Sequence, residues 1–115
     1  MVNDTTTAPK VRNLKQMLQY QEKAVVSRML VKNPAGNVTL FAFEGNEGLS
    51  EHTAPYDALI VGVDGHAEVL LGGVRHTVGE GDCLLMPAHM PHAVHPAGDF
   101  KMLLVMIRGE AQPEK

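Results

Sequence analysis

The sequence predicts an all-β domain, an antiparallel sandwich or barrel built from about nine short strands. Three observations support this fold class. Short apolar runs recur at spacings near ten residues along most of the chain. The 11 glycines and 7 prolines are spread between these runs, where they mark tight turns. Helical periodicity is confined to one short segment near the N-terminus, and the chain contains no internal repeat.

The size and charge of the chain limit the number of domains it can form and the kinds of partner it can bind. Its 115 residues, 44% of them hydrophobic, suffice for one domain with its own core. We therefore expect residues 1–115 to form a single domain with a mobile tail at 1–10 and a charged tail at 110–115. The net charge of −3 without a Lys/Arg cluster argues against nucleic acid and acidic membranes as partners. Neither a membrane-length apolar run nor a signal core is present, which predicts a soluble cytoplasmic protein.

The first expected element is a short helix. Asn13 resembles a helix cap with Gln16 three residues later, and Leu14, Met17 and Leu18 share one face. Such a short helix is unstable alone, so we expect it to dock on the barrel. The rest of the chain has the pattern of strands. These are expected at residues 24–32, 38–44, 49–53, 58–63, 66–71, 74–78, 83–86, 92–95 and 100–108.

The strands are joined by turns, and several are apolar on both faces. Gly72-Gly73 predicts a two-residue hairpin. A strand of a one-sided sheet would alternate between apolar and polar residues. One face must therefore line the barrel interior, and the other must pack on a second sheet or a partner chain. Together with the short N-terminal segment, which needs a surface to cover, this predicts a homodimer.

The chain is organised around residues 79–92, GEGDCLLMPAHMPH. A glycine turn precedes the run CLLM, which indicates a short strand buried on both faces. Cys83 is the only cysteine, so an intrachain disulfide is impossible, and its apolar neighbours predict an unreactive core residue. Pro87 and Pro91 fix a corner that places His92 at the start of the next strand. A corner of this kind can aim an imidazole at a ligand.

These spacings resemble the two motifs of the cupin family, a double-stranded β-helix or jelly-roll barrel. Gly81, Pro87 and His92 match the second motif, with His89 at a position where the family has Gly. In the first motif, His52 takes the place of the first His and Gly65 that of the final Gly. The resemblance covers roughly residues 36 to 107. Within the family, the chain is similar to a recognisable subgroup of small, RmlC-like cupins. It implies the jelly-roll fold, with the short helix before it.

The resemblance also implies a metal site, but this chain lacks part of the ligand set of the family. Cupins hold a divalent metal with three His and one Glu. Here Ala54 and Ala58 replace the second His and the Glu, which leaves His52 and His92 as metal ligands. Two ligands leave too many open positions for tight binding. A weakly bound Zn, Ni, Mn or Fe ion is one expectation, and no metal at all is the other. The two His could also be polar groups held inside the barrel by hydrogen bonds or water.

Other polar residues near the motifs are weaker candidates. Tyr56 and Asp57 could hydrogen-bond a ligand at the barrel mouth. Strand alternation opposes Asp57 unless the corner at Pro55 is bulged. His89 could contact the ligand too, although it occupies a turn position where His tolerates positive φ. His95 is expected on the opposite face from His92. The remaining candidates are His66 and His76, expected at the surface or in hairpins, and Met29, Met86, Met102 and Met106, which suit a soft pocket or ordinary core.

Two hypotheses about function follow. The first is a small-molecule binding module, with the ligand held in the barrel by His52 and His92. The alternative is a metal-dependent enzyme of isomerase, lyase or dioxygenase type that acts on a small polar metabolite, with His92 as the best catalytic candidate. No nucleophile motif or phosphate-binding loop supports a different chemistry. The first hypothesis is favoured, although the fold alone cannot decide between them.

Overall fold

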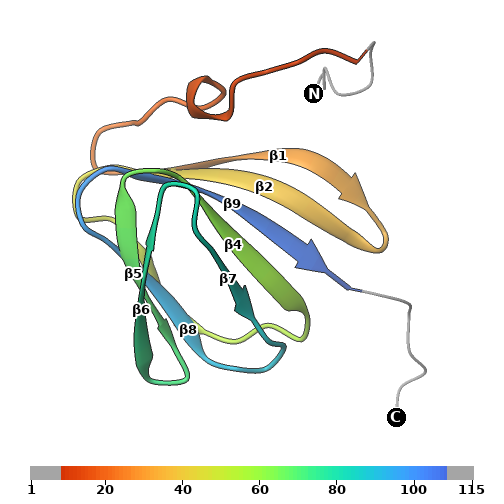
Figure 1. Cartoon of the computed structure of the whole chain (residues 1–115), viewed down its shortest axis with the longest axis vertical. Coiled ribbons are helices and arrows are strands. Elements are labelled where there is room, and N and C mark those ends of the chain that lie inside the picture. The colour runs from red at the N-terminus through yellow and green to blue at the C-terminus, as the bar shows by residue number, and fades with distance from the viewer. Residues whose placement is uncertain (1–8, 109–115) are drawn as a thin grey trace.

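The computed structural model describes residues 9–108 and shows nine strands in two sheets (Figure 1). The predicted all-β jelly roll is confirmed, and the strand bounds lie within two residues of those expected. The tails predicted at 1–10 and 110–115 fall largely or wholly outside the described residues. No described helix is long and apolar enough to cross a membrane. The strands are β1 (Val25–Asn33), β2 (Gly36–Phe43), β3 (Leu49–His52), β4 (Asp57–Asp64), β5 (His66–Leu71), β6 (Val74–Gly79), β7 (Cys83–Met86), β8 (His92–Pro96) and β9 (Phe100–Ile107).

The two sheets face each other across one core. One sheet has the order β1-β2-β9-β4-β7 and the other the order β3-β8-β5-β6. All neighbours are antiparallel, and β9 pairs with both β2 and β4. Each sheet therefore contains strands from both halves of the sequence, as in a jelly roll.

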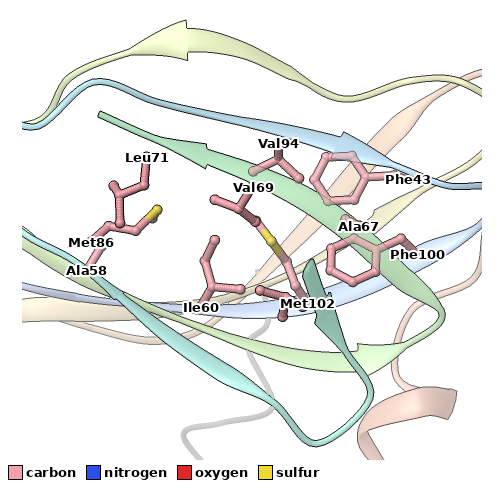
Figure 2. Packing of buried hydrophobic residues seen from close by; sticks show 11 residues of the cluster. Phe43, Ala58, Ile60, Ala67, Val69, Leu71, Met86, Val94, Phe100 and Met102 are labelled. Atoms are coloured by element: carbon pink, nitrogen blue, oxygen red, sulfur yellow. The ribbon is translucent and has the colours of Figure 1, made fainter. Parts of the chain in front are cut away.

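The core is filled by the inward-facing residues of both sheets (Figure 2). Phe43 and Phe100 stack with ring centroids 5.9 Å apart, and Ile60, Met102 and Val69 are fully or almost fully buried beside them. Burying a large apolar side chain stabilises a fold by about 1.5–3 kcal/mol. This interior holds the two sheets together.

The predicted N-terminal helix is wrong. The segment forms only a 3₁₀ turn, Leu14–Gln16, capped by the Asn13 side chain, which accepts a hydrogen bond from the Lys15 amide. The reason lies in the sheet beneath it. The Lys101 ammonium donates to the carbonyl of Lys15, and the Arg28 guanidinium donates to that of Met17. A longer helix would need those carbonyls for its own hydrogen bonds.

The expectation that residues 83–86 are buried on both faces is also wrong. Met86 is buried, but Cys83 and Leu85 are exposed. β7 is an edge strand, and its outward side chains have no cover within the described chain. An apolar run shows that both faces suit burial, but not what buries them.

Gly62 fixes the approach of the two sheets at one end of the barrel. A Cβ built at this position would lie 2.0 Å from the carbonyl oxygen of Gly79. The backbone of Gly62 also exchanges hydrogen bonds with the turn after β6, because its amide donates to Asp82 and its carbonyl accepts from Gly81. Only glycine allows this contact without displacing backbone.

Candidate functional site

His52 and His92 lie side by side at the ends of two neighbouring strands. His52 ends β3, His92 begins β8, and the two residues are register partners. Their Nε2 atoms are 3.1 Å apart, and the rings meet edge to face with centroids 4.3 Å apart. His92 is buried, whereas His52 is exposed. The pair therefore joins the barrel interior to the solvent.

Each ring is held through its other nitrogen. Nδ1 of His52 is 2.8 Å from the carbonyl oxygen of Ser50, and Nδ1 of His92 is 3.1 Å from that of Met90. A carbonyl oxygen only accepts hydrogen bonds, so the tautomer with the hydrogen on Nδ1 satisfies both of these contacts. In the neutral rings both Nε2 atoms are then acceptors. Two lone pairs 3.1 Å apart repel each other unless a proton, a hydrogen-bond donor or a cation lies at them.

The corner between β7 and β8 fixes the position of His92. His89 adopts a φ of 70°, and its amide donates to the carbonyl of Ala54, 2.7 Å away. The amide of Gly72 donates to the carbonyl of Pro91, 2.8 Å away. These bonds attach the corner to the loop after β3 and to the β5–β6 hairpin. The His89 side chain is exposed at this turn, where its backbone conformation has a structural role.

Tyr56 and Asp57 are engaged elsewhere. One carboxylate oxygen of Asp57 accepts a hydrogen bond from the amide of Ala88, 2.9 Å away. Asp57 begins β4 opposite Ile107 on the outward face, as strand alternation requires. The Tyr56 ring lies under the Arg108 guanidinium, 5.2 Å from the ring centroid. The structure does not bring either side chain to the histidine pair.

The other histidines also lie apart from the pair. His95 faces outward opposite Glu68, and His66 is exposed. His76, expected at the surface or in a hairpin, lies in the β5–β6 hairpin, where it is half-buried and shares the inward row of its sheet with Val69. Its place follows from strand pairing, which the hairpin signal alone did not specify.

The wall beside the pair is apolar. Leu71 is the register partner of His92 on β5 and lies inward with it. Across the barrel, Ala58 pairs with Met86 on β7 and with Met106 on β9. Figure 2 shows Leu71, Met86 and Ala58 gathered at one end of the core. The site thus combines two imidazoles with a small apolar surface.

Sequence reasoning missed the two carbonyls that orient the rings. Each belongs to the residue two positions before its histidine, Ser50 and Met90. Because every residue carries the same carbonyl, no side-chain identity could have indicated this role.

The two imidazoles are suitable ligands for a divalent metal, but two ligands are too few to hold one tightly. A ligating His typically donates its second ring N–H to a carbonyl, as both do here. Two imidazole nitrogens on one zinc ion, each at about 2.0–2.1 Å, would be about 2.9–3.4 Å apart for bond angles between 90° and 109°, which includes the observed 3.1 Å. However, no group of three or more His, Cys, Asp or Glu side chains is placed to bind a metal among residues 9–108. Any ion would take its remaining ligands from water or a bound molecule.

Solved structures resemble this chain over nearly its whole length. A conserved protein of unknown function from Streptococcus pyogenes is 31% identical, with a TM-score of 0.85 over 91% of this chain and 92% of that one. A cupin superfamily protein from Desulfitobacterium hafniense is 27% identical, with a TM-score of 0.82 over 88% and 93% of the two chains. A cupin 2 conserved barrel domain protein from Leptotrichia buccalis is 37% identical and has a TM-score of 0.80 over 84% of this chain, which spans 47% of that protein.

A search of the curated proteins gave no match. The model of a family described as a cupin domain matches residues 39–108, more than half of the chain. This range includes both histidines, the corner between β7 and β8, and seven complete strands. From this match, we conclude that the chain belongs to the cupin family.

Proposed function

We propose that this cupin is a small-molecule binding module whose ligand is held at His52 and His92. The observation that carries the proposal is the pair of Nε2 atoms 3.1 Å apart, each on a ring whose Nδ1 faces a carbonyl. Such an arrangement presents two acceptors in one place. It favours a ligand that supplies a hydrogen-bond donor, or a divalent metal ion to which the ligand then binds.

The surroundings favour a small ligand with an apolar part. The side chains of Ala58, Met86 and Leu71 offer no charge and no strong hydrogen-bond donor. Methionine adapts its shape to different ligands. A metal held by two neutral imidazoles alone would keep its full positive charge. Anionic groups such as carboxylates would then complete its coordination sphere.

Metal titration tests the site without knowledge of the natural ligand. Untagged protein is stripped with a chelator and titrated with Co²⁺, with calorimetry for affinity and visible absorption for coordination. We expect weak binding, with a dissociation constant that rises at least about tenfold, or about 1.4 kcal/mol, in His52→Ala and in His92→Ala. His95→Ala, on the outward side of β8, is the matched control and should behave as the parent.

Two results would count against the proposal. One is equal Co²⁺ binding by the parent and both site variants, together with unchanged recovery of any small molecule detected by native mass spectrometry. The other is a fall in melting temperature of tens of degrees in His92→Ala, which would make His92 a structural hydrogen-bonding group. The enzymatic alternative stays a prediction, and stoichiometric metal in protein purified without a tag would favour it.

A further inference from the structure

The carboxylate of Asp57 holds the start of the corner between β7 and β8. The pairing of β4 with β7 ends at Ala58 and Met86. Beyond this end, the amide of Ala88 donates to a carboxylate oxygen of Asp57, 2.9 Å away, rather than to the backbone of β4. The side chain of Asp57 thus replaces a backbone acceptor at the point where the chain leaves the larger sheet.

A second hydrogen bond joins the same two segments. The amide of the next residue, His89, donates to the carbonyl of Ala54, 2.7 Å away. Ala54 lies two residues after His52, which ends β3, and Asp57 lies three residues further on. His89 in turn precedes His92 by three residues. Two adjacent amides of the segment before one histidine are therefore bound to the segment that follows the other.

We infer that Asp57 is a positioning residue for the histidine pair, an inference that rests on the proposed function. Its carboxylate fixes the corner that contains Met90, and the carbonyl of Met90 lies 3.1 Å from Nδ1 of His92. When the corner moves, this carbonyl moves with it, and the ring of His92 loses the acceptor that selects its tautomer. Its Nε2 atom, 3.1 Å from that of His52, is then no longer presented as an acceptor. Asp57 acts through the backbone of the corner rather than through contact with either imidazole.

The stiffness of the corner carries the effect from Asp57 to His92. Pro87 and Pro91 restrict φ at its two ends, so a displacement at one end is passed to the other. The bond to Asp57 lies at the surface, where water can replace the carboxylate once it is removed. Its loss should therefore loosen the corner without unfolding the barrel, whose core is made by the inward residues of both sheets.

Asp82 offers a matched control at the opposite end of β7. Its carboxylate accepts a hydrogen bond of the same length, 2.9 Å, from the amide of Gly79, and that bond also lies at the surface. Asp82 precedes Cys83, the first residue of β7, whereas Ala88 follows Met86, the last. Asp82→Ala therefore removes the same kind of bond at the end of the strand away from the histidines.

The ring-nitrogen chemical shifts of metal-free, ¹⁵N-labelled protein test the inference. At about pH 8.5, where free imidazole side chains are neutral, they report the tautomer of each ring. The parent should carry the hydrogen of His92 on Nδ1. Asp57→Ala should give a mixture of tautomers and raise the Co²⁺ dissociation constant about fivefold or more. Asp57→Asn keeps an oxygen acceptor and should restore both values, and Asp82→Ala should match the parent.

Asp57→Leu, which is similar in volume but has no acceptor, should behave as Asp57→Ala and replaces it if that variant does not fold, as circular dichroism will show. Four results overturn the inference: a parent with the hydrogen of His92 on Nε2, an unchanged tautomer in the variants without an acceptor, no restoration by Asp57→Asn, and an equal change in Asp82→Ala. If the parent binds no Co²⁺, that result counts against the proposed function, and the ring shifts alone decide the role of Asp57.

Discussion

Replacement of Ala58 by glutamate should convert the histidine pair into a stronger metal site at a cost in stability. Ala58 is buried on β4 between Met86 and Met106, and the resemblance to the cupin motif implies that it stands where that motif has its metal-binding Glu. A carboxylate there would join His52 and His92. Two imidazoles and one carboxylate form a set that binds divalent transition metals and leaves positions open.

The magnitude follows from burial. Overpacking a core costs about 1–3 kcal/mol, and burying a polar group without a partner costs a further 1–3 kcal/mol or so. Without metal, Ala58→Glu should therefore lose about 2–6 kcal/mol. At about 4 °C per kcal/mol, the melting temperature falls by about 8–24 °C. Metal at about 1,000 times its dissociation constant restores about 4 kcal/mol by binding the folded state.

The assay compares melting in chelator with melting in excess Zn²⁺ or Ni²⁺, followed by metal analysis after dialysis. Ala67→Glu is the control, because Ala67 is also buried but lies at the opposite end of the core (Figure 2). It should be destabilised to a similar extent without recovery in metal. If Ala58→Glu folds but retains no more metal than the parent, or if Ala67→Glu recovers equally, position 58 does not face the histidine pair.

Two further predictions concern the packing of the two sheets and the charge of the N-terminal segment. Gly62→Ala should cost at least about 2–3 kcal/mol in urea denaturation, because its Cβ would overlap the Gly79 carbonyl; an unchanged midpoint would show that the two strands can move apart freely. Burial, aided by the hydrogen bond to Asp64, raises the pKa of the Tyr20 phenol above its usual range. The unfolded phenol ionises near pH 10 and so binds fewer protons than the folded one above that pH. The parent should thus lose stability from about pH 10 upward relative to Tyr20→Phe; parallel profiles between pH 8 and 11 would contradict this.

The sequence predicted the strands well because their signals are local. Alternating turns and apolar runs depend on glycine, proline and β-branched residues, whose preferences act within a few residues. The spacing of the motif through Gly81, Pro87 and His92 likewise indicated which histidine begins β8. The contact of His92 with His52 could be expected only through the resemblance to a family. The pairing of β3 with β8 leaves no local signal.

What the sequence did not predict depends on distant atoms. The N-terminal segment remains a single turn because Lys101 and Arg28, far along the chain, bind its carbonyls. Cys83 is exposed because β7 is at the edge of its sheet, although the same four residues would suit a buried strand. The orientation of the imidazoles depends on backbone oxygens, which no residue type identifies.

The central position of β9 in its sheet has a consequence for co-translational folding. β9 is the last strand along residues 9–108, yet it lies between β2 and β4 in the middle of the larger sheet. During synthesis, the edges of β2 and β4 that β9 later covers stay unpaired until residues 100–107 leave the exit tunnel. The barrel can therefore close only after β9 has been synthesised, and pairings so distant in sequence form slowly. A chain cut before Phe100 would expose two sheet edges with their apolar faces, a target for proteases and for aggregation.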